Sequence, residues 1–391
     1  MRFIIVLTLS ITSLFAYAQF VTGNADTKPS PGTIKQQSNP KPMLGLPPLI
    51  IPVDNPQTQA KIELGNKLFH DKRFSIDGTV SCSNCHDDNK AFTDNLPVSL
   101  GNNGKFGTRN APTVINAAYN KVQFWDGREP DLESQSKQPL INPVEHGLSD
   151  YKPLLTIVQT DPEYVTAFKS VFNINEKAIT MDYVAKAIAS FERTVLSGNS
   201  AFDRYYFKGD KTALSEAQMR GLQVFLGQGR CVSCHVIEND QALFTDSKFH
   251  NIGIGINQIQ QDVPKLAEAF LAAKNKGANV DISVLSDKKS SELGRFAVTD
   301  VLSEVGAFKT PTLRDIELTA PYMHDGSLKN LNDVVKHYNN GGVTKVGDPV
   351  NPYLSGGIRP LKLDNNQIDD LVAFLKALTG SKAANLAAKE N

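Results

Sequence analysis

The sequence has no excess of charge of either sign, because 41 Lys and Arg residues balance 41 Asp and Glu residues. The missing basic excess argues against a nucleic-acid-binding or membrane-surface protein. Long apolar runs are also lacking, since the run from Phe3 to Phe15 is shorter than the ~20 residues that a spanning helix needs. Strand-like runs are scarce as well. We therefore expect a mainly α-helical globular protein without a nucleic-acid partner.

Cysteine is equally scarce, and its placement is informative. The four cysteines form two C-x-x-C-H motifs, one with Cys82, Cys85 and His86 and the other with Cys231, Cys234 and His235. This pattern is typical of covalent c-type haem attachment, in which the thiols become thioethers and the histidine binds iron. Disulfides or a zinc site are the alternatives, but the two cysteine pairs of a structural zinc site usually lie much closer in sequence. The motifs predict a dihaem cytochrome.

The chain of 391 residues is long enough for two domains, and one motif in each half predicts one haem per domain. Residues 1–18 have the pattern of a signal peptide, with Arg2, an apolar core and an A-x-A site, and a retained membrane anchor is the alternative. Export agrees with haem attachment, so we predict a periplasmic protein with no membrane span after cleavage. Residues 19–50, rich in Pro, Gln, Thr, Asn and Lys, are expected to form a disordered leader.

We predict an N-terminal haem domain at residues 51–210 and a C-terminal haem domain at residues 211–385. A helix at 57–70 leads into the first motif and a helix beginning at Ser215 leads into the second, which suggests distant internal repeats. The remaining expected elements are helices at 150–172, 181–196 and 367–378, and a polar surface insertion at about 256–290 with one short helix.

Several further motifs resemble those of the bacterial dihaem cytochrome c peroxidase/MauG superfamily. They follow the family's order and comprise residues 65–69 (GNKLF), 109–113 (RNAPT), 123–128 (QFWDGR), 142–145 (NPVE), 294–299 (GRFAVT) and 318–322 (LTAPY). The resemblance covers about residues 55–380, apart from 256–290. It implies two cytochrome c-like domains, with peroxide reacting at the N-terminal haem and electrons entering at the C-terminal haem.

The resemblance also implies roles for individual residues. His86 would be the proximal ligand of the peroxidatic haem. Glu145 would be the distal acid–base carboxylate that O–O cleavage requires, the alternative being a helix-end or surface carboxylate. Gln135 would be the distal amide, and Trp125, the only tryptophan, would lie between the haems as an electron relay or a core anchor.

A calcium site is implied as well, because Asn110, Thr319 and Pro321 match positions that hold a calcium ion in the family. Calcium takes oxygen ligands that include backbone carbonyl groups, so a proline can take part. Only one side-chain amide oxygen and two backbone carbonyl groups would then identify the site.

The chain departs from the family pattern near both haems. Asn102 replaces the histidine that caps the first haem in many family peroxidases, so we expect that haem to be open to peroxide in the oxidised protein. Tyr338 stands where the peroxidases have a methionine ligand, as in the MauG branch, with Met323 and His337 as rival ligands. His146 replaces the usual methionine beside the distal glutamate, and either shares in proton transfer or is a solvated loop residue.

These expectations converge on a dihaem peroxidase that reduces hydrogen peroxide with electrons from a small cytochrome c or cupredoxin. The resemblance adds a homodimer as an option, because relatives are commonly dimers, while the sequence itself leaves the oligomeric state open. One alternative is a MauG-like enzyme that uses an oxidised haem pair to modify another protein. The other is a plain dihaem electron-transfer cytochrome, which would have both irons six-coordinate and no distal acid.

Overall fold

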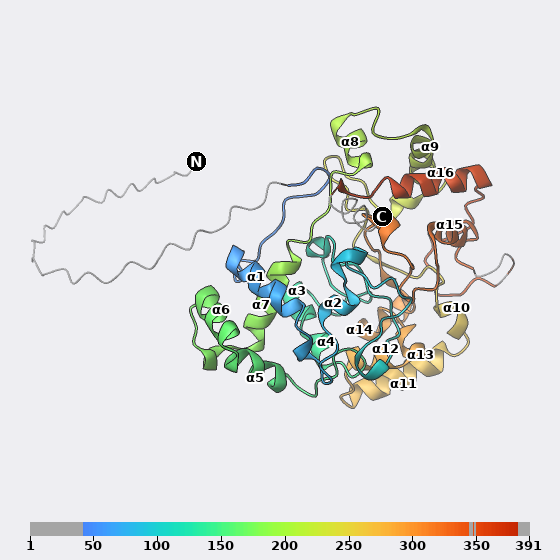
Figure 1. Cartoon of the computed structure of the whole chain (residues 1–391). Helices are drawn as coiled ribbons and strands as arrows, with labels where there is room; N and C mark the ends of the chain where they lie inside the picture. Colours follow the sequence, from blue (N-terminus) through green and yellow to red (C-terminus); the bar gives the residue numbers. More distant parts are fainter. Residues whose placement is uncertain (1–41, 344–346, 348, 382–391) are drawn as a thin grey trace, which may run out of the picture. The chain divides into compact units, whose positions relative to one another are not determined.

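The helix that precedes each C-x-x-C-H motif is present where the sequence predicts it. A computed structural model describes residues 42–343, 347 and 349–381 of the chain. Thr58 caps helix α1 (Gln59–Phe69) by accepting from the Lys61 N–H group. Ser215 forms a capping box with Gln218 at the start of α9 (Glu216–Leu226). Residues 70–81, with a short 3-10 helix at Lys72–Phe74, join α1 to the first motif, and residues 227–230 join α9 to the second (Figure 1).

The described structure is mainly helical, as predicted. In the N-terminal half the helices after α1 are α2 (Cys82–Cys85), α3 (Leu132–Gln135), α4 (Gln138–Ile141), α5 (Lys152–Thr160), α6 (Pro162–Phe172), α7 (Met181–Glu192) and α8 (Ala201–Lys208). After α9 they are α10 (Ile256–Ile259), α11 (Val263–Asn275), α12 (Val280–Ser286), α13 (Lys288–Ser291), α14 (Phe296–Thr299), α15 (Leu331–Asn339) and α16 (Asn365–Lys376). Strands β1 (Phe249–His250) and β2 (Phe308–Lys309) pair antiparallel, with Phe249 opposite Lys309.

A close helix crossing recurs in both halves. Helix α1 packs on α7, and α9 packs on α16. A Cβ atom added at Gly65 would lie 1.9 Å from the Ala187 carbonyl oxygen, and one at Gly221 would lie 2.0 Å from the Asp370 carbonyl oxygen. Only glycine permits this approach of two helix backbones. The same device therefore brings together the first and last long helices around each haem motif.

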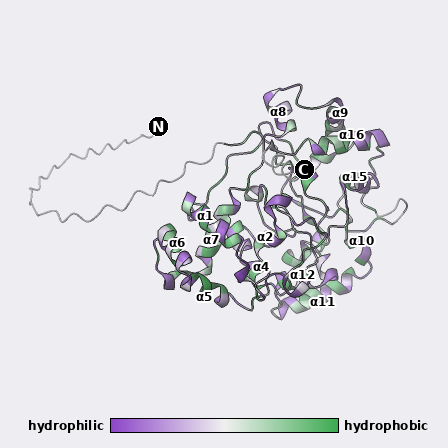
Figure 2. Cartoon of the chain, viewed as in Figure 1, coloured by the Kyte–Doolittle hydropathy of each residue, from purple (hydrophilic) through white to green (hydrophobic). Residues whose placement is uncertain are grey.

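The buried apolar residues form three clusters. One surrounds α1, α5, α6 and α7, and a second surrounds α8, α9, α15 and α16. The third lies among α10 to α14. Figure 2 shows hydrophobic and hydrophilic residues on the same helices, which is the pattern of helices that bury one face. Within residues 42–343, 347 and 349–381, no helix has the length and apolar character that crossing a membrane requires.

The prediction of a surface insertion at 256–290 is wrong in two respects. The segment forms α10, α11 and α12 and begins α13, where one short helix was expected. It also has a buried face, because Val263, Ala267 and Phe270 follow one another at helical spacing and are buried. The high polarity of the segment belongs to the opposite, solvated face of these helices.

The predicted disordered leader extends too far along the chain. Leu46 and Leu49 are buried, and the Gly45 carbonyl group accepts hydrogen bonds from the Ala242 N–H group and the Arg314 guanidinium. Residues 42–50 are thus packed against the C-terminal half. Residues 19–41 of the predicted leader, the predicted signal peptide at 1–18 and the end of the last predicted domain after residue 381 lie outside the described residues.

The other predicted helices are present with shifted bounds. The expected helix at 150–172 is two helices, α5 and α6, because Pro162 begins the second and Asp161 caps it. Helix α16 buries Ile368, Leu371, Phe374 and Leu375 as predicted, while the predicted inward residue Val372 is partly buried. The predicted domain boundary between residues 210 and 211 stays a prediction.

Two candidate haem sites and the residues between them

The first C-x-x-C-H motif forms the short helix α2 and places its histidine at the edge of a cavity. Cys82, Cys85 and His86 all line this cavity, and both thiols are free of disulfides. The His86 Nδ1 atom lies 3.2 Å from the Phe92 carbonyl oxygen. Since a carbonyl oxygen only accepts, Nδ1 carries the proton and the Nε2 lone pair is left for a metal. Burial lowers the pKa of His86, which favours the neutral imidazole that iron binds.

The second motif repeats this arrangement at a second cavity, which Cys231, Cys234 and His235 line. His235 Nδ1 lies 2.8 Å from the Phe244 carbonyl oxygen, and burial lowers the pKa of His235. Phe92 and Phe244 share a left-handed backbone, with φ of 57° and 52°. Both begin the tripeptide Phe-Thr-Asp, at 92–94 and 244–246. This repeat was visible in the sequence and could have identified the residues that hold the proximal histidines.

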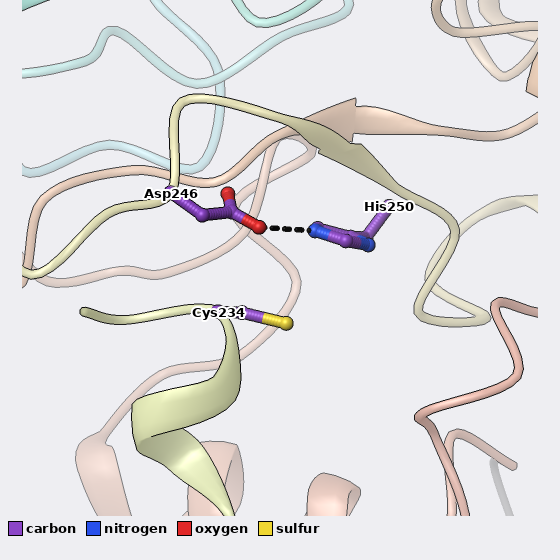
Figure 3. Close-up of side chains that lie close together, drawn as sticks. All are labelled: Cys234, Asp246 and His250. Carbon is purple, nitrogen blue, oxygen red and sulfur yellow. Dashed lines mark hydrogen bonds and ion pairs between the residues drawn. The ribbon is translucent and has the colours of Figure 1, made fainter.

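The second motif also contacts a histidine–carboxylate pair, shown in Figure 3. The His250 Nε2 atom lies 2.8 Å from Asp246 Oδ2, and ligand atoms of Cys234, Asp246 and His250 lie within 4.8 Å of one another. The Cys234 thiol and then Asp246 raise the pKa of His250 to about 9. Because Cys234 belongs to the C-x-x-C-H motif, this cluster is part of the second haem site and not a separate metal site.

The distal residues predicted by resemblance lie in the first cavity. Glu145 and Gln135 line the same cavity as His86. Glu145 follows α4 in a turn closed by its own N–H group, which donates to the Asn142 carbonyl group. Its Oε2 atom is buried and has no hydrogen-bond partner among the described residues. Burial, and then the charge of Asp281, raise the pKa of Glu145 to about 8. A buried Oε2 atom does not fit the alternative of a surface carboxylate, and the catalytic role of Glu145 stays a prediction.

Asn102 holds the turn that contains Glu145. Its side-chain amide donates to the carbonyl groups of Pro143 and Glu145, both at 3.0 Å, and its backbone N–H group donates to Glu145 at 2.8 Å. The loop approaches so closely that a Cβ atom at Gly101 would lie 1.8 Å from the Val144 carbonyl oxygen. Asn102 is not among the residues that line the cavity. The residue that replaces the capping histidine thus faces the distal turn.

His146 is buried, so the alternative of a solvated loop histidine is wrong. It lines the first cavity, and its Nδ1 atom lies 3.0 Å from the Phe74 carbonyl oxygen. Burial lowers the pKa of His146 to about 4. The side chain is therefore neutral near pH 7 and is held in place by the segment that precedes the first motif.

A buried ion network supports the distal side, and its membership was not predicted. Asp126 accepts from Arg109 at 2.6 Å and from Arg128 at 2.9 Å. Arg128 also binds Asp281 at 2.5 Å, and Asp281 accepts from the Asn142 amide at 2.5 Å. Two cations balance two carboxylates, as buried charges require. Asp281 lies on α12, so the segment predicted to be a surface insertion contacts the residues that precede Glu145.

Trp125 lines both cavities. Its indole N–H group donates to the Asn110 carbonyl group at 2.9 Å, and its own carbonyl group accepts from the Lys309 N–H group at 2.8 Å. The Asn110 N–H group donates in turn to the His324 carbonyl group at 2.8 Å. Trp125 and His324 each precede an Asp-Gly pair and so occupy equivalent positions in the two halves. The carbonyl group of each accepts a hydrogen bond from a backbone N–H group of the other half.

The second cavity separates the three rival iron ligands. Tyr338 and Met323 line it together with His235, whereas His337 is not among its lining residues. The His337 Nε2 atom instead lies 2.8 Å from the Ile252 carbonyl oxygen. Burial raises the pKa of Tyr338. Tyr338 and Met323 therefore remain candidates for the iron ligand, whereas the His337 ring is bound to a backbone carbonyl group outside the lining of this cavity.

The predicted calcium residues Asn110, Thr319 and Pro321 are all among the residues that line the second cavity. Two of their side-chain donors have partners: the Asn110 amide donates to the Leu96 carbonyl group at 2.9 Å, and the Thr319 hydroxyl donates to Ile316 at 3.4 Å. Donation from these groups leaves the oxygen atoms of both side chains able to bind a cation.

Both cavities suit a haem, since each combines two unpaired thiols with a histidine whose Nδ1 atom is engaged and whose surroundings are largely apolar. Such a pair of sites on a mainly helical chain defines a dihaem cytochrome. The chain belongs to the di-haem cytochrome c peroxidase family, a family of peroxidase-type oxidoreductases, whose model matches residues 59–212. We therefore assign two haems to it.

Similar proteins include both branches of this family. The chain is 34% identical over 387 residues to cytochrome-c peroxidase IdrP1 of Pseudomonas sp. (strain SCT), covering 96% of this chain and 92% of the relative. It is 33% identical over 339 residues to the methylamine utilization protein MauG of Methylorubrum extorquens, covering 85% and 82%. A crystal structure of a MauG-like protein associated with microbial copper homeostasis matches with a TM-score of 0.70 and 31% identity, covering 87% of this chain and 95% of that one.

Proposed function

We propose that the protein is a periplasmic dihaem peroxidase with covalently attached haems that reduces hydrogen peroxide to water. Electrons would come from a small cytochrome c or cupredoxin. The observation that supports this proposal is the presence of Glu145, with an unpartnered carboxyl oxygen, and Gln135 in the cavity of His86. A plain electron-transfer cytochrome has no use for an acid and an amide on that side.

The reaction consumes two electrons and two protons per peroxide and yields two water molecules. The haem supplies iron to bind peroxide and a route for electrons. Glu145 would accept the proton of the iron-side peroxide oxygen on a carboxylate oxygen and return it to the leaving oxygen. The Gln135 amide would donate a hydrogen bond that orients peroxide in the cavity. Because this relayed proton belongs to peroxide itself, both protons that the reaction consumes would come from solvent.

Electrons would enter at the His235 haem and reach the His86 haem through Trp125. Its contact with both cavities supports this route, as do its hydrogen bonds to Asn110 and Lys309. A calcium ion at Asn110, Thr319 and Pro321 would lie beside the same route. We further propose that residues 51–210 and 211–385 are the peroxidatic and electron-transfer domains, respectively.

A MauG-like function is the second candidate, and Tyr338 favours it. Its side chain lines the second cavity, as does the rival Met323, and phenolate ligation would stabilise ferric iron and lower the haem potential. A low potential would make the second haem a poor acceptor of electrons from a high-potential donor. The enzyme would then oxidise a protein substrate with peroxide.

One experiment separates these functions. Peroxide is added to the ferric dihaem protein, the spectrum is followed, and turnover is measured with a reduced small cytochrome c or cupredoxin. We expect rapid turnover in the wild type and a loss of 10²–10⁴-fold in kcat/KM for peroxide in Glu145→Gln, a change that keeps size and polarity. A long-lived oxidised state with poor turnover would support the MauG-like function, and Tyr338→Phe should then alter the low-spin spectrum. Absence of any reaction with peroxide would overturn both.

A further inference from the structure

Lys309 is a cation without a partner at the junction of the two cavities. It lines both of them, on strand β2 beside Trp125. Desolvation alone lowers the pKa of Lys309 to about 8, with no contribution from a carboxylate. Among the described residues, no hydrogen bond or ion pair of its ammonium group is found.

The three arginines with buried side chains that line the cavities are each paired with a protein carboxylate. Arg109 and Arg128 pair with Asp126, and Arg314 pairs with Asp203 at 2.9 Å. An enclosed ammonium group without a counter-charge is costly, and proteins seldom retain one that has no anion to bind. Lys309 therefore marks a position where an anion from outside the polypeptide would be stabilised.

The position of Lys309 has a counterpart in the first half of the chain. Lys309 precedes Thr310-Pro311-Thr312, and Asn110 precedes Ala111-Pro112-Thr113 at the equivalent place in the first half. The N–H groups of these two residues donate to the carbonyl groups of Trp125 and His324, respectively. The junction thus has one neutral and one cationic side chain at related positions, and both of them line both cavities.

We propose that Lys309 is an anion-binding residue whose ligand is a haem propionate carboxylate at the junction of the two haems. The inference rests on the proposed dihaem state, because each haem brings two carboxylates into a cavity that this ammonium group lines. One propionate bound to Lys309 neutralises a charge in a low-dielectric region, and the ammonium group in turn favours the ferrous form of the nearby iron. Lys309 is accordingly a positioning and potential-setting residue and does not contact peroxide.

The test is a spectroelectrochemical titration of both haems without peroxide. The variants are Lys309→Met, Lys309→Arg and, as a matched control, Lys248→Met, which removes an exposed lysine from the segment next to β1. We expect Lys309→Met to lower the ferrous-to-ferric ratio of at least one haem about tenfold at a fixed potential, a shift of about 59 mV for a one-electron couple. Lys309→Arg and Lys248→Met should stay close to the wild type.

Unchanged potentials of both haems in Lys309→Met would overturn the proposal. If that variant fails to incorporate haem, the comparison of Lys309→Gln with Lys309→Arg decides in the same way, since the two keep a long polar side chain and differ in charge. The titration involves no peroxide. A wild type without peroxidase turnover would therefore refute the proposed function without affecting the proposal for Lys309. Normal turnover together with unchanged haem potentials in Lys309→Met would refute the proposal for Lys309 and support the proposed function.

Discussion

At the scale of single residues, the distal side of the first cavity depends on side chains that do not enter it. Asn102 is buried and binds two carbonyl groups of the turn that contains Glu145. Asn103 donates to Asn102 Oδ1 at 2.8 Å and so orients the Asn102 amide. A carboxyl group that must reach peroxide in one geometry gains from a backbone fixed in this way.

We predict that Asn102→Ala weakens both the turn and the reaction. The carbonyl oxygens of Pro143 and Glu145 would each lose one donor and keep another, from Lys105 Nζ and the backbone N–H group of residue 102, so each lost bond should cost about 0.5–1.5 kcal/mol in the free energy of unfolding. The kcat/KM for peroxide should fall at least about tenfold, because small displacements of a catalytic group are costly. The ferric spectrum should keep the high-spin component that we expect in the wild type, since Asn102 does not line the cavity.

The control for this prediction is Asn103→Gly. Asn103 has a left-handed φ of 52°, which glycine adopts readily, and its N–H bond to Asp77 would remain. The change removes the Asn103 donor to Asn102 Oδ1 and keeps both bonds from the Asn102 amide to the turn, so stability and kcat/KM should change less than in Asn102→Ala. A purely low-spin ferric wild type, or an Asn102→Ala variant with unchanged kcat/KM, would contradict the role given to Asn102.

At the scale of elements, helix α12 connects the third apolar cluster to the distal side. Val284 and Leu285 pack in that cluster, while Asp281, one turn earlier, binds Arg128 and Asn142. The charge of Asp281 also raises the pKa of Glu145, after the larger effect of burial, and Arg128 opposes it. The 256–290 segment therefore influences the proton affinity of the distal acid.

We predict that Asp281→Asn shifts the pH profile of the reaction. Glu145 acts as a base in its ionised form, so kcat/KM for peroxide should rise with pH and level off above about 8 in the wild type. Removing the negative charge of Asp281 removes a cause of the raised pKa, and the rise should move to lower pH. Asparagine keeps an oxygen acceptor for Arg128, which still pairs with Asp126.

The stability of the protein should follow the opposite course with pH. Because the folded pKa of Glu145 is raised from 4.5, the folded state binds its proton more tightly than the unfolded state. This group therefore favours folding fully below about pH 4.5, and the contribution is lost as pH rises to about 8.

The control for Asp281→Asn is Asp262→Asn, which removes an exposed carboxylate of the same segment and should leave the pH profile of kcat/KM unchanged. If Asp281→Asn leaves the pH profile of kcat/KM unchanged, the assignment of Glu145 as the base whose pKa Asp281 raises would be contradicted.

The sequence predicted some features of the site well, and physical reasons explain the others. Covalent chemistry requires Cys82, Cys85 and His86 in consecutive register, so a local motif was enough to place them. Asp281 acts through Arg128, which is far away in the chain, and Lys309 matters because it lines both cavities; neither placement can be derived from the neighbouring sequence. The buried face of α11 was visible as apolar residues at helical spacing, but the overall polarity of the segment obscured it.

At the scale of the whole molecule, the chain consists of two related halves with different side chains at equivalent positions. Both halves have the glycine helix crossing, the C-x-x-C-H motif, the Phe-Thr-Asp tripeptide and a Pro-Thr pair. Glu145 and Gln135 line the first cavity, whereas Tyr338 and Met323 line the second. The shared backbone accounts for two haems, and the different side chains account for the separate roles that we propose for them.

Buried contacts between the halves lead to a prediction about their cooperativity. Arg128 of the first half binds Asp281 of the second, and Arg109 of the first half donates to the hydroxyl and carbonyl oxygens of Ser291 in the second. Breaking a buried ion pair by removing one partner costs about 3–5 kcal/mol, so neither half can unfold and leave these charges behind without penalty. We expect the dihaem protein to unfold in one calorimetric transition.

Gly65→Ala and Gly221→Ala test this expectation, one in each half. Each added methyl group would lie 1.9–2.0 Å from a helix carbonyl oxygen, far inside van der Waals contact, which forces the crossing helices apart at a cost of about 1–3 kcal/mol. Both variants should lower the Tm of the same single transition by several degrees, whereas Gly356→Ala, at a position with open space, should not. Two separate transitions, each lowered by only one of the variants, would contradict this expectation. The halves would then unfold independently in spite of the buried polar contacts between them.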